Sequence, residues 1–182
     1  MRKADIIPLG DIKPAIAETA FIAPGTSIIG DVAIAEDASI WYNCVIRADV
    51  NHVRVGARTN IQDGSVIHCD SAHGDHPGYP TLIGEDCLIG HMVLLHGCTL
   101  LDRAFVGMGA IVLNGATIES DGMLAAGAML TSGKTIRSGE LWAGRPAKFL
   151  RALSAEELES NRKGVENYVR NGHRHAAALK DG

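Results

Sequence analysis

Aromatic residues are scarce in this chain of 182 residues: two Trp, three Tyr and three Phe make up 4% of it, although 46% is hydrophobic. Ordinary globular cores draw much of their buried area from aromatic rings. This core must instead be filled by Ile, Val, Leu and Ala, and the 21 glycines imply frequent turns.

Other features that are absent exclude whole classes of protein. No apolar stretch approaches the roughly 18–20 residues of a membrane span, and the first residues lack the apolar region of a secretory signal. The four cysteines form no CxxC pair. The net charge is −4 and there is no Lys/Arg-rich run, which argues against nucleic acid as a partner. We therefore expect a cytoplasmic protein that binds neither nucleic acid nor membrane.

The sequence is dominated by an internal repeat of six residues. An aliphatic residue occupies every sixth position over long stretches, with three interruptions. The positions are Ile22, Ile28, Ile34, Ile40 and Ile46; Val55, Ile61 and Ile67; Ile83, Ile89 and Leu95; and Leu100, Val106, Val112, Ile118, Leu124, Leu130 and Ile136.

This period is typical of neither a helix nor an ordinary strand, because six residues rotate a helix by about 240° net and a strand alternates every two. Three six-residue sides instead make a triangular coil of about 18 residues, stacked on the next coil by parallel strands. The repeat predicts an all-β fold, a single-stranded left-handed parallel β-helix, over residues 1–150. A β-sandwich with chance periodicity is the alternative.

The last segment, residues 151–182, has a different pattern. Ser154 and Glu157 form a capping box, in which each side chain can bond the other's backbone amide. Leu158, Val165 and Val169 then follow at helical spacing. We predict a C-terminal helix over about 155–171, ending before Gly172, with the helix and tail packed on the β-helix.

Six of the eight histidines lie in or beside the interruptions of the repeat, at 46–55, 67–83 and 95–100. His68 and His96 each follow an inward aliphatic residue and are 28 residues apart, one coil plus ten inserted residues. If the insertion is extruded, the two stack about 4.8 Å apart at the backbone. Two imidazole nitrogens on one zinc lie roughly 3.3 Å apart, a distance that stacked histidines can reach.

His91 lies five residues before His96, almost one side of the triangle away, so it faces outward from a different edge. In a three-fold assembly it could face the His68/His96 pair of the next subunit. The alternative is that all three are ordinary surface histidines at coil corners.

These residues resemble the γ-class carbonic anhydrase family, over residues 8–170. The most specific stretches are Arg47-Ala48-Asp49-Val50-Asn51, residues 56–65, His68, Gly90-His91, Leu95-His96-Gly97-Cys98 and Val106-Gly107-Met108-Gly109. The resemblance implies a homotrimer that hydrates CO₂ reversibly to bicarbonate, with one Zn²⁺ (or Fe²⁺ or Co²⁺) per subunit interface.

The resemblance also implies a role for individual residues. The metal ligands would be His68 and His96 of one chain and His91 of its neighbour. Arg47 and Asp63 would form an ion pair that helps hold the trimer together. Asp49 and Gln62 would hydrogen-bond around the metal-bound water or bicarbonate.

The sequence departs from the family pattern at the acidic residues used for proton transfer. Val50 follows Asp49, Ser71 stands three residues after His68, and a Tyr/Asn pair expected near the last coils is replaced by Ala125-Ala126-Gly127. His73 and His76, in the ten-residue insertion, are candidate proton-relay groups. Cys69 is expected to point to the opposite face from His68.

Two other functions remain open at this point. Hexapeptide β-helices also host acyl-group enzymes, either acetyltransferases or acyl-CoA thioesterases, which usually keep one catalytic histidine. A non-catalytic metal-binding trimer is the second alternative, and the departures in the acidic residues favour it.

Overall fold

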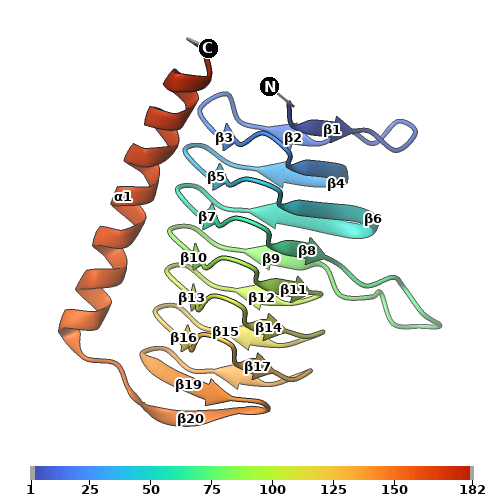
Figure 1. Cartoon of the computed structure of the whole chain (residues 1–182). Helices are drawn as coiled ribbons and strands as arrows, with labels where there is room; N and C mark the ends of the chain where they lie inside the picture. The colour runs from blue at the N-terminus through green and yellow to red at the C-terminus, as the bar shows by residue number, and fades with distance from the viewer. Residues whose placement is uncertain (1–2, 181–182) are drawn as a thin grey trace.

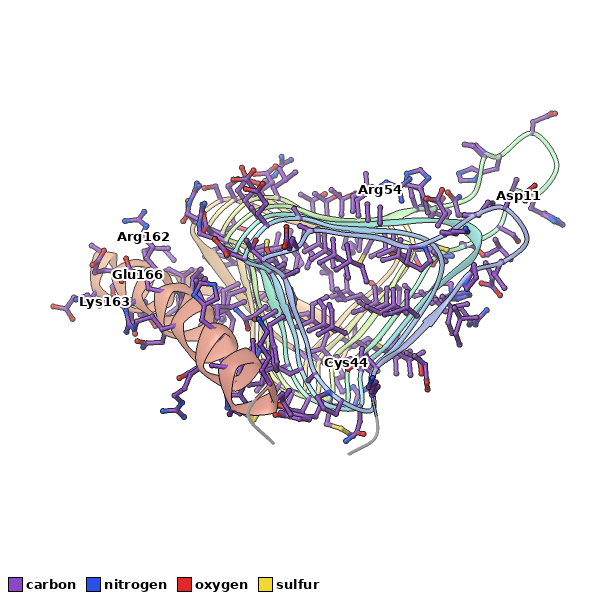
Figure 2. The ribbon with its side chains drawn as sticks, turned by 90° about the horizontal axis from the view of Figure 1, so that it is seen from above. Asp11, Cys44, Arg54, Arg162, Lys163 and Glu166 are labelled. Carbon is purple, nitrogen blue, oxygen red and sulfur yellow. The ribbon has the colours of Figure 1, made fainter. Side chains whose placement is uncertain are left out.

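The computed structural model describes residues 3–180 and shows a parallel β-helix of about eight turns with one long helix beside it (Figure 1). Seen along its axis, the coil has a triangular outline whose interior is filled with side chains (Figure 2). The predicted all-β fold, a parallel β-helix followed by a C-terminal α-helix, is confirmed. Three flat faces, named A, B and C here, alternate along the chain.

The strands of each face stack in parallel register. Face A contains β1 (Asp5–Ile7), the first halves of β4 (Ser27–Ile34) and β6 (Val45–Val55), β8 (Val66–His68), β11 (Leu94–His96), β14 (Ile111–Val112) and β17 (Met129–Leu130). Face B contains β2 (Ala15–Ile16), the second halves of β4 and β6, β9 (Thr81–Ile83), β12 (Thr99–Leu100), β15 (Thr117–Ile118) and β18 (Thr135–Ile136).

Face C is a separate sheet. It contains β3 (Phe21–Ile22), β5 (Ser39–Ile40), β7 (Asn60–Ile61), β10 (Leu88–Ile89), β13 (Phe105–Val106), β16 (Met123–Leu124), β19 (Glu140–Gly144) and β20 (Ala147–Ala152). The last strand, β20, runs antiparallel to β19 and ends the stack.

The six-residue repeat forms the core as predicted. Each inward residue pairs in register with the inward residue one coil away, as Ile46 does with Ile67 and Ile67 with Leu95. All the repeat positions except Ile22 are buried, with at most 4% of the residue exposed. Columns of branched aliphatic side chains fill this narrow prism, which explains why the sequence needs so few rings.

The interruptions of the repeat are excursions from the coil. In β6 the register shifts between Ala48 and Val53, so that residues 49–52 bulge outward at the corner between faces A and B. Residues 69–80 leave the same corner as a hairpin, on the side of the molecule away from the helix (Figure 1). Both excursions therefore lie at one corner.

Helix α1 (Ala155–Lys180) packs along face C and is longer than predicted. The prediction that it stops before Gly172 is wrong, because tertiary packing outweighs the cost of about 1 kcal/mol for an interior glycine. Gly172 is buried so close to β3 that a Cβ there would lie 3.4 Å from the Cβ of Phe21. Beyond it, His175 Nδ1 lies 2.8 Å from the Tyr42 hydroxyl, and its ring contacts Trp41 at 5.0 Å.

The capping box at the start of α1 is formed as predicted. Ser154 N donates to Glu157 Oε2 at 2.9 Å, and Glu157 N donates to Ser154 Oγ at 3.2 Å. Arg151 also forms two hydrogen bonds to this carboxylate. The Arg151 guanidinium, followed by the Ser154 amide, lowers the pKa of Glu157 to about 2.

We expect Glu157→Ala to lower the thermal unfolding midpoint at pH 7, with the effect disappearing in acid. A carboxyl whose pKa is lower in the folded chain stabilises it above the unfolded pKa, and loses this effect as pH falls toward about 2. Calorimetry from pH 7 to pH 2 measures the difference from wild type. Glu156→Ala, in the same first turn, is the control and should show a smaller difference. An unchanged difference at pH 2 would contradict the assignment.

No helix within residues 3–180 is long and apolar enough to cross a membrane.

Candidate functional site

His68 and His96 meet at the corner between faces A and B, at the ends of β8 and β11. They are register partners on adjacent coils, as the 28-residue spacing predicts once the hairpin is extruded. Their ring centroids are 5.0 Å apart, and His68 Nδ1 lies 3.1 Å from His96 Nε2. Parallel strand pairing thus brings one nitrogen of each imidazole together.

The other nitrogen of His68 is held by Asp49, on the bulge of β6. His68 Nε2 lies 2.9 Å from Asp49 Oδ1, and Arg47 bonds the second carboxylate oxygen. His68, followed by Arg47, lowers the pKa of Asp49, so this carboxylate is ionised and only accepts. His68 must therefore donate from Nε2, which leaves a lone pair on Nδ1 of the neutral ring.

The other nitrogen of His96 is held by Asn114, on the next coil. His96 Nδ1 lies 2.5 Å from Asn114 Oδ1, while Asn114 Nδ2 donates to Asp70 Oδ2 at 2.9 Å. Because the amide group donates to Asp70, its oxygen faces His96 and accepts. His96 must then donate from Nδ1, which leaves a lone pair on Nε2.

Two lone pairs therefore converge at a separation of 3.1 Å, between His68 Nδ1 and His96 Nε2. Two neutral imidazoles in these tautomers cannot hydrogen-bond each other, so the two nitrogens are placed either to share a proton or to hold a metal ion together. The separation is close to the roughly 3.3 Å between two nitrogens on a tetrahedral zinc. The two outer partners, Asp49 and Asn114, also match the usual support of metal-binding histidines.

Sequence reasoning missed Asn114 and Asp70. Asn114 lies 18 residues after His96, but the register between β11 and β14 is 17 residues, since Leu95 pairs with Val112, so the six-residue count points to Leu113 instead. Asp70 lies at the base of the hairpin, two residues after His68, and nothing in the six-residue pattern predicts its direction. We call Asp49, His68, His96 and Asn114 the paired-histidine half-site.

His91 lies at a different corner, between faces C and A, in the turn after β10. His91 Nδ1 is 2.9 Å from Asp63 Oδ2, and Asp63 occupies the matching turn one coil earlier. The preceding residue, Gln62, is nearly buried and donates from Nε2 to Asn60 Oδ1 at 3.0 Å. We call Gln62, Asp63 and His91 the single-histidine half-site.

The predicted site residues are thus divided between the two edges of face A. Within residues 3–180, no three His, Cys, Asp or Glu side chains gather in a way that could hold a metal ion. The predicted partners Arg47 and Asp63 bond Asp49 and His91 respectively within the chain. A pair between Arg47 and Asp63 of neighbouring chains stays a prediction.

The strip of face A between the half-sites is apolar on its outer surface. One outward side chain from each of five successive coils lies in a single register column. The column consists of Val45, Val66, Leu94, Ile111 and Met129. Val66 and Leu94 are exposed, and so are Met92 and Met108 beside His91. Helix α1 covers face C, so within residues 3–180 this strip has no helix over it (Figure 2).

The hairpin that carries the predicted relay histidines is ordered by hydrogen bonds. The backbones of His73 and His76 form a two-bond bridge, and His76 Nδ1 accepts from Gly78 N at 3.0 Å. The His76 ring packs on Tyr79 at 4.4 Å. Within residues 3–180, the hydrogen bonds of His73 and His76 stay inside the hairpin, so proton transfer between them and the paired-histidine half-site stays a prediction.

Cys69 is fully buried in the core, whereas its neighbour His68 is partly exposed, as strand alternation predicts. Burial raises the pKa of the Cys69 thiol. A neutral buried thiol is a poor metal ligand, because the thiolate is the ligand form.

Comparisons with known proteins place the chain in one family. The chain is 45% identical over 176 residues to "Gamma carbonic anhydrase 1, mitochondrial" of Arabidopsis thaliana, covering 97% of this chain but 64% of that protein, slightly under two thirds. It is 43% identical to "Carbonic anhydrase" of Geobacillus kaustophilus, covering 92% of this chain and 88% of the relative.

A solved structure from Bacillus cereus, described as a putative acetyltransferase, is 39% identical with a TM-score of 0.92, over 97% of this chain and 99% of that one. No model of a known protein family matches the chain. The identity to these relatives, of which the Geobacillus protein is covered over 88% of its length, shows the family: the chain belongs to the γ-class carbonic anhydrases.

Proposed function

We propose that this protein catalyses the metal-dependent, reversible hydration of CO₂ to bicarbonate at the interfaces of a homotrimer. The observation that carries the proposal is the pair of converging lone pairs on His68 and His96, with the third predicted ligand at the opposite edge of the same face. Its membership of the γ-class carbonic anhydrases supports the reaction.

The positions of the half-sites favour a closed ring. Each chain carries two different and complementary edges, and such head-to-tail contacts close into a ring when the rotation allows it. Joining the single-histidine half-site of one chain to the paired-histidine half-site of the next would complete three ligands. The same contact would bring Asp63 toward Arg47 of the neighbour and turn the apolar strips of face A toward the axis.

The imidazole nitrogens of the three proposed ligands are chemically suited to zinc. Three neutral imidazoles with an open fourth position are a typical catalytic zinc set, and imidazole also suits Fe²⁺ and Co²⁺. His68, His96 and a neighbour's His91 would hold the ion. When bound, the ion supplies Lewis acidity that makes water a nucleophile near neutral pH.

Side chains of the protein orient the metal ligands and the bicarbonate and exchange protons with bulk water. Asp49 and Asn114 each fix one histidine in the tautomer that presents a lone pair. Gln62 belongs to the single-histidine half-site, where its amide nitrogen donates to Asn60, and we assign it to orient bicarbonate together with Asp49. His73 and His76 lie on the hairpin at this corner and would exchange protons with bulk water.

An acyl-group enzyme is the second candidate, supported by the description of the Bacillus cereus relative. In an acyl transferase, one histidine needs a free nitrogen to remove a proton from the acceptor. Here the exposed nitrogens of His68 and His96 face each other at 3.1 Å, an arrangement that suits a shared cation better. A non-catalytic metal-binding trimer is the third candidate. Four free, buried cysteines suit the reducing cytoplasm, where we place the protein.

The decisive experiment measures CO₂ hydration by stopped flow with a pH indicator, on full-length protein purified with its metal. We expect activity to fall to the uncatalysed rate after dipicolinate removes the metal, and to return at one zinc per chain. The same samples, mixed with acetyl-CoA and an amine acceptor, test the acyl reaction by thiol release. Full zinc occupancy without CO₂ hydration would contradict the proposed reaction and favour the non-catalytic metal-binding trimer.

A further inference from the structure

A chain of hydrogen bonds connects the base of the hairpin to His96. Asp70 Oδ2 accepts from Asn114 Nδ2 at 2.9 Å, and Asn114 Oδ1 accepts from His96 Nδ1 at 2.5 Å. Asp70 itself is fixed by its backbone, which exchanges two hydrogen bonds with that of Tyr79 across the hairpin base. The amide of Asn51 also donates to the Asp70 carbonyl, from the neighbouring bulge.

Asp70 sets which end of the Asn114 amide faces His96 in this series of hydrogen bonds. An asparagine amide alone could turn either its oxygen or its nitrogen toward a histidine. A carboxylate accepts only, so it selects the orientation in which the Asn114 oxygen faces His96. The reversed amide would donate to His96 Nδ1 and move the ring proton to Nε2, where it would block the lone pair.

Packing keeps Asn114 in place. Gly115 follows Asn114 in the same turn, and Gly97 lies in the matching turn one coil earlier; both have positive φ, +67° and +57° respectively. A Cβ at Gly97 would lie 2.7 Å from the Cβ of Tyr79, and one at Gly115 would lie 3.0 Å from its ring. Tyr79 therefore fills the space that the two glycines leave, and the hairpin lies directly against the turn that carries Asn114.

We propose that Asn114 and Asp70 are positioning residues, which together hold His96 as the Nδ1–H tautomer and so keep its Nε2 lone pair available to the metal. The inference rests on the proposed function, since it needs a metal at His96. It gives the hairpin a second role, because the carboxylate that sets the tautomer belongs to the hairpin base.

Zinc affinity is the first test, measured by competition between the full-length zinc protein and a chromophoric chelator. We expect Asn114→Ala to weaken zinc binding about 10–100-fold, the usual loss for an outer partner of a metal ligand. Asp70→Ala should weaken it too. Asp70→Asn can present either its oxygen or its nitrogen to Asn114, so it no longer fixes the direction of that amide and should also weaken zinc binding, by less than Asp70→Ala. Asp75→Ala removes an exposed carboxylate from the same hairpin and is the control, which should stay within about threefold of wild type.

Exchanging the side chains of residues 70 and 114 distinguishes a positioning role from an effect on folding. In the double variant Asp70→Asn/Asn114→Asp, the new carboxylate accepts from both His96 and the new amide, so zinc affinity should return to near wild type. The Asn114→Asp single variant places two carboxylates together and should remain weak. Thermal unfolding midpoints of the metal-free proteins identify any variant that fails to fold.

The tautomer itself is the second readout. Long-range ¹H–¹⁵N spectra of ¹⁵N-histidine-labelled, chelated protein should show His96 protonated at Nδ1 in wild type and a mixture of tautomers in Asn114→Ala. Tight zinc binding by wild type together with unchanged affinity in Asn114→Ala would overturn this inference and leave the proposed function intact. Failure of wild type to bind zinc would overturn both.

Discussion

Co-expressing a His91→Ala chain with a His96→Ala chain is expected to restore about a quarter of the wild-type CO₂ hydration activity, although each variant alone is inactive. Each single substitution removes one of three ligands from every site in a homotrimer. The loss should exceed the about 10–100-fold effect of an outer partner, and bound zinc should fall with it.

The recovery follows from the division of the site between two edges. His96 belongs to the paired-histidine half-site and His91 to the single-histidine half-site of the next chain. In a mixed ring, one interface joins an intact pair to an intact His91, whichever variant is in excess. Random assembly of equal amounts makes about three quarters of the rings mixed, each with one working site in three.

A matched control uses two substitutions in the same half-site. Co-expressing His68→Ala with His96→Ala damages every pair, so no interface can recover. Two different affinity tags allow mixed rings to be isolated before the assay. Appreciable activity in His91→Ala alone, or no recovery in isolated mixed rings, would contradict a site shared between chains.

The core and the stacked histidines could be predicted from the sequence because both follow from one rule. A fixed period places residues one coil apart in register, so Ile67 lies over Leu95 and His68 over His96. Applied once more, the rule places Leu113 over His96, because Leu95 pairs with Val112, and it misses Asn114 by one residue. What it does not give is the direction of a polar side chain outside the coil, such as that of Asp70.

The end of the C-terminal helix could not be predicted for a different reason. Local preferences stop the helix at Gly172, but the aromatic cluster of Phe21, Trp41 and Tyr42 on the first coils continues to pack against it. This contact joins residues more than a hundred positions apart. Its effect cannot be found in any local window of sequence.

Leu94→Glu is expected to convert the proposed trimer to monomers of 19.2 kDa and to abolish activity, although all three histidines are unchanged. Leu94 is 36% exposed in the chain, at the middle of the apolar column of face A. In the proposed ring, three glutamates would face one another near the axis. Burying unpaired charges costs several kcal/mol each, more than a marginal interface tolerates.

The matched control is Leu101→Glu, since Leu101 is exposed to a similar extent, 42%, but lies in the turn after β12, at the end of face B away from face A. It should leave mass, zinc content and activity near wild type. Sedimentation velocity gives the mass, and circular dichroism shows whether the Leu94→Glu chain keeps its β-helix. We expect it to stay folded, because the core side chains point inward and Leu94 does not. A folded Leu94→Glu monomer that still hydrated CO₂ would mean that one chain completes the site alone. A variant that stayed trimeric would mean that the half-sites meet without face A.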